Sequence, residues 1–87
     1  MYELVLTADA RAAYQHANKT LLKKLNRCFA QLQTDPYQHP NIKRLTGNLA
    51  GRWRYRIGDW RVIYRVTESP PRVTILMIVP RGSAYLP

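Results

Sequence analysis

Residues 51–66 read GRWRYRIGDWRVIYRV, and arginine alternates in this segment with aromatic or aliphatic side chains. An alternation with a period of two predicts β-strands whose two faces differ in character. The pair Gly58-Asp59 interrupts the alternation, and glycine at the first central position is typical of a two-residue type II′ turn. The segment therefore predicts a β-hairpin with strands at about residues 52–57 and 60–67.

A turn at Gly58-Asp59 also predicts the register of this hairpin. The expected cross-strand pairs are Ile57 with Trp60, Arg56 with Arg61, Tyr55 with Val62, Arg54 with Ile63 and Trp53 with Tyr64. One face is then apolar and is formed by Trp53, Tyr55, Ile57, Trp60, Val62, Tyr64 and Val66. The opposite face carries Arg54, Arg56, Arg61 and Arg65.

The directly opposed pair Arg56 and Arg61 costs stability, on the order of a few tenths of a kcal/mol or more. A bound phosphate would offset this cost, so the cationic face indicates an anionic ligand. The alternative is a solvated face that keeps a small protein soluble. Because Arg61 lies outside the apolar face, we predict that its replacement by alanine leaves the fold intact.

The first 34 residues predict a short strand at residues 2–6 and then a helical hairpin. Thr7 can cap a helix over residues 8–17, Asn18 is a break, and Thr20 is expected to cap the second helix. Asp35-Pro36 ends that helix, because the residue before proline is disfavoured in the helical region. Its apolar stripe, in which the single cysteine is expected to be a core residue, comprises Leu21, Leu25, Cys28, Phe29 and Leu32.

The rest of the chain predicts a loop at residues 37–51 with a short strand near 42–45, a turn at 69–71, and a buried central strand at 73–79. The order of elements indicates an α+β fold, in which the N-terminal helical hairpin packs on a mainly antiparallel sheet of three to five strands. The length of 87 residues suits a single domain spanning residues 1–87.

The charge is strongly positive and unevenly distributed. Fourteen basic side chains stand against five acidic ones, and residues 43–87 carry nine basic and two acidic groups. Such a balance favours nucleic acid as the first partner to consider. The chain lacks a secretory leader and an apolar run of about 20 residues, and its one cysteine fits a reducing compartment. We therefore expect a cytoplasmic protein without membrane association.

The residues alone give little sign of conventional catalytic groups. His16 and His39 are far apart, the five carboxylates are scattered, and no cluster of cysteine and histidine is present, so no metal or cofactor is expected. Arg81 and Tyr85 follow the strand at 73–79, and strand ends are common places for functional groups. The alternative is a solvent-facing Arg81 with Tyr85 packed against the sheet edge.

Residues 43–66 resemble the centre of the RelE/ParE toxin superfamily. The match consists of a K-x-L-x-G segment at residues 43–47, the arginine-rich hairpin that follows it, and the C-terminal arginine and tyrosine. Residues 2–10 and the helix end at 32–36 are also similar, so the resemblance covers nearly the whole chain.

The resemblance implies a toxin of a type II toxin–antitoxin system, neutralised by a cognate acidic antitoxin. In the RelE branch it implies a metal-independent endoribonuclease that acts with the ribosome, cleaves mRNA in the A site and so inhibits translation. The catalytic residues carried over are Arg54, Arg56, Arg61, Arg81 and Tyr85.

Two departures from the RelE pattern concern the first-strand cations and the position before Arg81. The first-strand cations are lysine in the best-known RelE enzymes but arginine here, and Pro80 stands where the family often has histidine. Arginine is always charged and is a poor general base, so the base stays unassigned. Two other readings stay open: a ParE-like inhibitor that binds DNA gyrase, and a nucleic-acid-binding module without catalysis.

Overall fold

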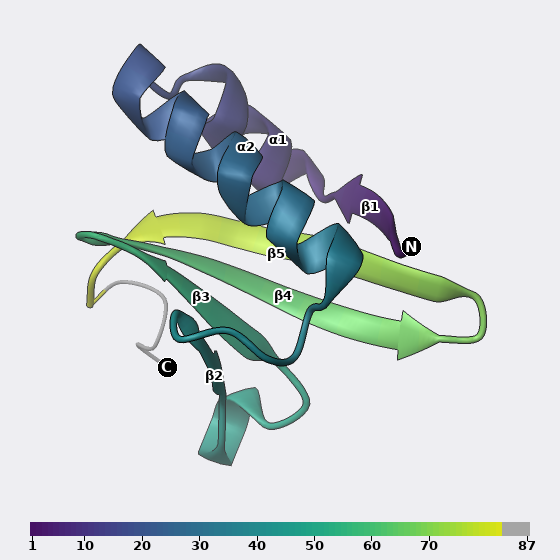
Figure 1. Cartoon of the computed structure of the whole chain (residues 1–87). Helices are drawn as coiled ribbons and strands as arrows, with labels where there is room; N and C mark the ends of the chain where they lie inside the picture. The colour runs from purple at the N-terminus through teal and green to yellow at the C-terminus, as the bar shows by residue number, and fades with distance from the viewer. Residues whose placement is uncertain (83–87) are drawn as a thin grey trace.

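The computed structural model describes residues 1–82, which form two helices and a five-stranded sheet (Figure 1). In chain order the elements are β1 (Glu3–Leu6), α1 (Ala8–Gln15), α2 (Lys19–Thr34), β2 (Ile42–Arg44), the 3₁₀ turn η1 (Gly47–Leu49), β3 (Trp53–Ile57), β4 (Trp60–Glu68) and β5 (Pro71–Pro80). The strand order is β1-β5-β4-β3-β2, in which β1 pairs with β5 in parallel and all other neighbours are antiparallel. Both helices cover the same face of the sheet, which confirms the predicted α+β fold.

The central hairpin has the predicted register. All five cross-strand pairs of β3 and β4, from Trp53–Tyr64 to Ile57–Trp60, occur as expected. Gly58 has a φ of +54°, and no residue other than glycine has a positive φ within residues 1–82. A positive φ at the first central residue alone is the pattern of the type II′ turn.

The helix starts are fixed by side-chain caps. Thr7 accepts a hydrogen bond from the Ala10 amide at 3.2 Å, as predicted, and α1 ends at Gln15. The second cap is Asn18, whose Oδ1 accepts from the Leu21 amide at 2.8 Å. The prediction of Thr20 as this cap is therefore wrong, because asparagine is the stronger N-cap residue and stands in extended backbone just before the helix.

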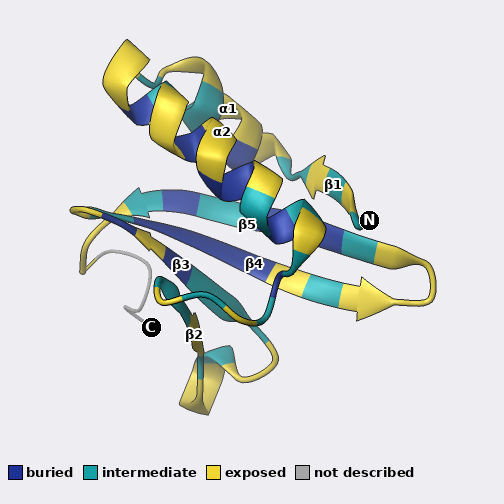
Figure 2. Ribbon diagram, in the orientation of Figure 1, coloured by how far each residue is buried: buried dark blue, intermediate teal, exposed yellow. Residues whose placement is uncertain are grey.

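The helices form the predicted hairpin and bury one stripe against the sheet (Figure 2). The rings of Tyr14 on α1 and Phe29 on α2 stack at 5.7 Å, and the Tyr14 hydroxyl donates to Asn26 at 2.6 Å. Cys28 is fully buried, as predicted. The core beneath the helices comprises Ala10, Leu21, Leu25, Cys28, Phe29, Leu32, Tyr55, Ile57, Val62, Tyr64, Val73, Ile75 and Ile78.

The loop after α2 is tied to the sheet through Tyr64. This side chain is fully buried, and its hydroxyl donates to the Pro36 carbonyl at 2.7 Å. Burial raises the pKa of the Tyr64 phenol, and burial likewise raises the pKa of the Cys28 thiol. The loop therefore leaves α2 in a fixed direction toward β2.

Neither of the helices within residues 1–82 has the length and apolar character needed to cross a membrane.

Candidate functional site

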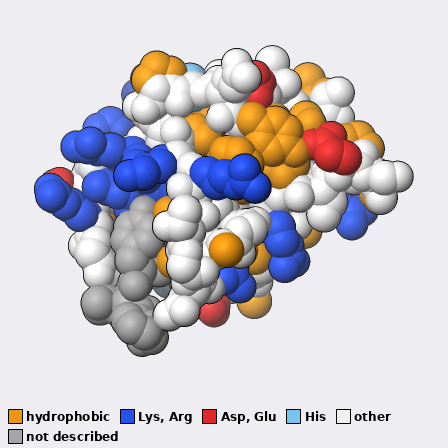
Figure 3. Space-filling model, turned by 90° about the horizontal axis from the view of Figure 1, so that it is seen from below, with side chains coloured by type: hydrophobic (Ala, Val, Ile, Leu, Met, Phe, Trp, Pro, Cys, Tyr) orange, Lys and Arg blue, Asp and Glu red, His pale blue; other side chains and the backbone are white. Residues whose placement is uncertain are grey.

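The sheet face turned away from the helices carries a cationic hollow of about 440 Å³. Figure 3 views the molecule from this side and shows lysine and arginine side chains gathered on it. Among residues 1–82, eight line the hollow, of which four are basic and none is acidic. The lining comprises Lys43, Arg44, Leu45, Thr46, Asn48, Leu49, Arg54 and Arg61. Such a lining suits a phosphate or another anionic group, because each guanidinium presents several N–H donors.

Arg54 reaches this hollow from β3 and is partly buried there. Its Nη1 donates to the backbone carbonyl of Asn41 at 3.3 Å. Its cross-strand partner on β2 is Lys43, so two cations lie side by side on the sheet. The Arg54 guanidinium is thus oriented by a neutral backbone group, and its positive charge is left for a ligand.

Arg61 is the second arginine of the hollow, and it is only 8% exposed. Its Nη1 donates to the carbonyls of Gly58 and Trp60, at 2.9 Å each. The side chain therefore folds back over the hairpin turn and binds two of its carbonyls. The burial and hydrogen bonds of Arg61 argue against the prediction that its replacement by alanine leaves the fold intact, and that outcome stays to be measured. Its predicted opposition to Arg56 is confirmed.

Arg56 and Arg81 lie near the same end of the sheet but outside this lining. Arg56 is exposed and lines a second hollow of about 200 Å³, together with Lys24 and Arg27 of α2. Arg81 is exposed directly after β5, and its backbone amide donates to the Asp59 carbonyl at 2.6 Å. The structure thus joins Arg54 and Arg61 in one hollow and places Arg56 and Arg81 around the hairpin turn. The predicted residue Tyr85 lies outside the described residues.

Lys43 and Arg44 were not among the residues expected from the sequence. Lys43 enters the hollow because β2 pairs with β3, which places Lys43 opposite Arg54. Arg44 pairs with Trp53 and also lines the hollow. The Arg44 guanidinium also lies over the Trp53 ring, 5.6 Å from its centroid, within the range of a cation–π contact. The sequence could have indicated Lys43 and Arg44 as site residues, because residues 36–58 hold five basic side chains and no acidic one.

The carboxylate of Glu68, at the end of β4, binds two tyrosine hydroxyls outside the lining of the hollow. Glu68 accepts hydrogen bonds from the hydroxyls of Tyr2, at 2.9 Å, and of Tyr37. The hydrogen bond to Glu68 raises the pKa of the Tyr2 phenol, while burial and then Glu68 raise the pKa of Tyr37. Both phenols therefore stay neutral donors. Within residues 1–82, no three His, Cys, Asp or Glu side chains form a group that could hold a metal ion.

The sequence matches over residues 4–85 the family described as the ParE toxin of the type II toxin–antitoxin system, parDE. No curated relative matches the chain. Among solved structures, the archaeal RelE–RelB complex from Pyrococcus horikoshii is similar, with a TM-score of 0.80 and 27% identity over 95% of this chain and 98% of that one.

Two further structures share the fold. The RelBE2 toxin–antitoxin complex from Mycobacterium tuberculosis has a TM-score of 0.78 and 27% identity, and the match covers 92% of this chain and 98% of that chain. The YoeB/ParE toxin from Agrobacterium tumefaciens has a TM-score of 0.82, with 91% of this chain and 98% of that chain covered. At 24% identity this last likeness concerns the fold alone.

Proposed function

This chain belongs to the family of ParE toxins of type II toxin–antitoxin systems, and we propose that it is an endoribonuclease that cleaves mRNA in the ribosomal A site. The single observation that carries the proposal is the hollow on the sheet face away from the helices, where four cations converge and the described lining holds no carboxylate. The likeness to the RelE structures from Pyrococcus horikoshii and Mycobacterium tuberculosis supports it. Cleavage of ribosome-bound mRNA would inhibit translation and would place the protein's action in the cytoplasm.

The proposed cleavage needs no covalent enzyme intermediate. The 2′-oxygen of the ribose attacks the adjacent phosphorus, the 2′-hydroxyl loses its proton, and the bond to the 5′-oxygen breaks as that oxygen takes up a proton. The products are a 2′,3′-cyclic phosphate and a 5′-hydroxyl. Negative charge grows on the phosphorane in between, and preorganised guanidinium groups stabilise such charge strongly. The ribosome would supply much of the alignment.

The arginines take different parts in this proposal. Arg54, oriented by the Asn41 carbonyl, donates to the phosphorane. Arg61 adds positive charge and holds the turn on which its neighbours depend. Arg56 and Arg81, exposed around that turn, contact the flanking backbone. Tyr85 stacks on a base, a common mode of recognition for unpaired RNA.

The proposed partner is a cognate acidic antitoxin, since the two RelE relatives were solved as complexes with RelB or as RelBE2. A groove of about 280 Å³ runs between α2 and the hairpin turn. Its lining includes the apolar residues Leu21, Ile57 and Trp60 together with the charged residues Lys24 and Asp59. It shares Lys24 and Ile57 with the second hollow, where Arg56 adds charge. Apolar contacts in the groove, next to the basic second hollow with Lys24, Arg27 and Arg56, fit an acidic amphipathic segment of the antitoxin.

The test of the nuclease is primer extension on mRNA translated in the presence of the purified protein. We expect cleavage within codons held in the ribosomal A site. Arg54→Ala and Arg81→Ala should each reduce the single-turnover rate by roughly 100-fold, the scale of losing one preorganised donor. Tyr85→Ala should also reduce it, and Tyr85→Phe less so if stacking is the role of this ring.

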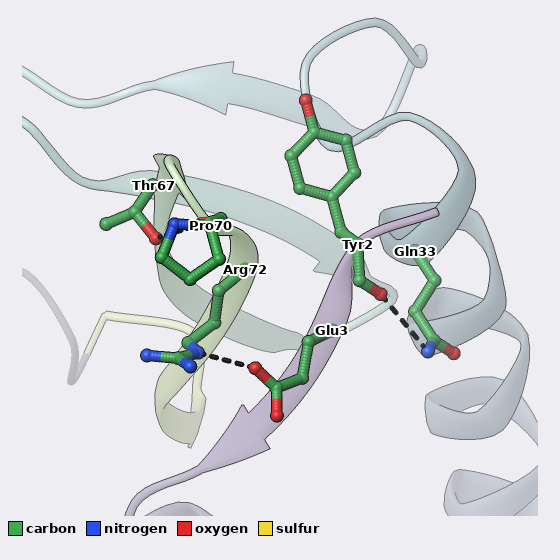
Figure 4. A network of polar contacts seen from close by, with 6 residues as sticks. All are labelled: Tyr2, Glu3, Gln33, Thr67, Pro70 and Arg72. Carbon is green, nitrogen blue, oxygen red and sulfur yellow. Dashed lines mark hydrogen bonds and ion pairs between the residues drawn. The ribbon is translucent and has the colours of Figure 1, made fainter.

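The matched control is Arg72→Ala, which removes an arginine from the start of β5 (Figure 4). Arg72 Nε donates to Glu3 Oε1 at 2.7 Å, away from the hollow. Its loss should leave cleavage unchanged. If Arg54→Ala and Arg81→Ala cleave ribosome-bound mRNA at the wild-type rate, the assignment of these residues fails.

A second candidate is a ParE-like inhibitor of DNA gyrase, which the match to the ParE family favours. The same cationic surface would then bind protein, and no RNA would be cleaved. A gyrase supercoiling assay with the purified protein separates the two functions. Inhibited supercoiling together with intact mRNA would replace the nuclease by this inhibitor.

A further inference from the structure

The loop between α2 and β2 carries His39, which packs against Tyr55 of β3. Its ring stacks on the ring of Tyr55, with centroids 5.2 Å apart and an angle of 26° between the planes. Its Nδ1 accepts a hydrogen bond from the backbone amide of Asn41 at 3.1 Å. The stacking fixes the plane of the imidazole, and the hydrogen bond fixes the peptide two residues ahead.

That same residue is the one that orients Arg54. The Asn41 carbonyl accepts from Arg54 Nη1 at 3.3 Å and from the Arg56 amide at 2.9 Å. Asn41 is thus held by the imidazole at its N–H group and holds the guanidinium at its C=O group. Tyr55, His39, Asn41 and Arg54 form one chain of contacts that begins in the core and ends in the hollow.

We propose that His39 is a positioning residue for Arg54. An arginine side chain carries about 2 kcal/mol of rotamer entropy, and a donor that is already oriented does not lose this freedom when the ligand binds. The imidazole supplies that orientation through Asn41. Acceptance at Nδ1 requires the ring proton to be at Nε2. The effect of His39 on RNA rests on the proposed nuclease function, whereas its effect on Arg54 does not.

Two substitutions separate the acceptor from the ring. His39→Phe keeps a ring for Tyr55 and removes the acceptor. His39→Asn removes the ring and keeps an acceptor, because an asparagine side chain bonds the amide two residues on in an Asx-turn. The matched control is His16→Phe, since His16 Nδ1 contacts only the Ala12 carbonyl at the end of α1 among the described residues.

The first experiment needs no RNA. Amide hydrogen exchange of Asn41 and ¹⁵N relaxation of Arg54 Nε are measured by NMR in the full-length protein. His39→Phe should raise the Asn41 exchange rate by roughly fivefold, the scale of one lost hydrogen bond, and should lower the order of Arg54 Nε. His39→Asn should stay near the wild type, and His16→Phe should change neither signal. Unchanged Arg54 order in His39→Phe would overturn the proposal.

The second experiment couples the two residues in the cleavage assay. His39→Phe should lower the single-turnover rate by roughly tenfold in the wild-type background, because a displaced donor loses part of its effect. In the Arg54→Ala background it should cause no further loss. An equal loss in both backgrounds overturns the proposal. If the wild type cleaves no RNA, the nuclease fails and the NMR experiment still decides the role of His39.

Folding is checked by melting temperature in every variant. If His39→Phe does not fold, His39→Ala and His39→Asn make the same comparison, because both lack the ring and only asparagine restores the acceptor. Restored Arg54 order in His39→Asn but not in His39→Ala supports positioning through Asn41. Equal disorder in both variants overturns it.

Discussion

Replacing Arg61 by alanine should weaken the fold, although Arg61 stands on the cationic face of the hairpin. The side chain is 8% exposed and donates to the Gly58 and Trp60 carbonyls. Hydrogen bonds from a charged group are worth about 1.5–3 kcal/mol. Relief from the like charge of Arg56 returns a few tenths of a kcal/mol. The free energy of unfolding should therefore fall by about 1–3 kcal/mol.

The assay is thermal and urea unfolding of purified variants. For a domain of this size a loss of 1 kcal/mol lowers Tm by roughly 4–8 °C, so Arg61→Ala should melt some 5–20 °C below the wild type. The control is Arg65→Ala, since Arg65 is exposed on the same strand. Substitutions at such surface positions usually change stability by less than about 0.5 kcal/mol.

Equal melting temperatures for Arg61→Ala and Arg65→Ala would refute the reasoning, because the two carbonyls would then not depend on the guanidinium. The result also decides how a cleavage rate is interpreted. If Arg61→Ala is destabilised as expected, its rate must be measured well below its melting temperature. A residual loss there measures the contribution of the Arg61 charge to catalysis.

Two further outcomes follow from groups away from the hollow. Burial raises the pKa of Tyr64 above its ordinary 10.0 and that of Cys28 above its ordinary 9.0, so the unfolded chain loses these protons first as the pH rises. The free energy of unfolding should keep its full value below pH 9 and fall above pH 9–10. Urea titrations at pH 7 and pH 10.5 measure this fall. A smaller fall in Cys28→Ala would show that the Cys28 thiol contributes to it. Arg72→Ala should change stability by less than about 1 kcal/mol in thermal unfolding, because its ion pair with Glu3 is exposed at 42% and 58%.

The hairpin could be predicted in detail because two independent signals agree there. The alternation in residues 51–66 assigns each side chain to a face, and the Gly58-Asp59 turn sets which residues face each other. The capping error at Thr20 shows the limit of a local rule, since Asn18 and Thr20 can both cap a helix and the chain uses the stronger cap, Asn18, in extended backbone. The sequence did not predict that β1 is a parallel edge strand beside β5, because this pairing depends on residues more than 60 positions away in the chain.

The candidate site could be predicted only in part, for a different reason. Alternation places Arg54 and Arg61 on one face, but it does not tell where a long flexible side chain ends. Arg61 turns back to the hairpin carbonyls, whereas Arg54 meets the carbonyl of a loop residue. Lys43 joins them only through the pairing of β2 with β3. The roles of these residues in cleavage stay predictions. Tyr85 lies outside the described residues 1–82, so its role also stays a prediction.

The positive charge of the hollow depends on where the chain uses its acids as much as on its arginines. Glu3 pairs with Arg72, Glu68 accepts from two tyrosines, and Asp35 accepts from the amides of Tyr37 and Gln38 at the end of α2. Each of these carboxylates stabilises a connection of the fold and stands outside the lining of the hollow. Arg54 is meanwhile held by a backbone carbonyl, which orients a guanidinium without neutralising it. The contacts that stabilise the fold therefore also keep these carboxylates away from the hollow. The result is a preorganised cationic surface, whose positive charge must be balanced by a ligand or a partner.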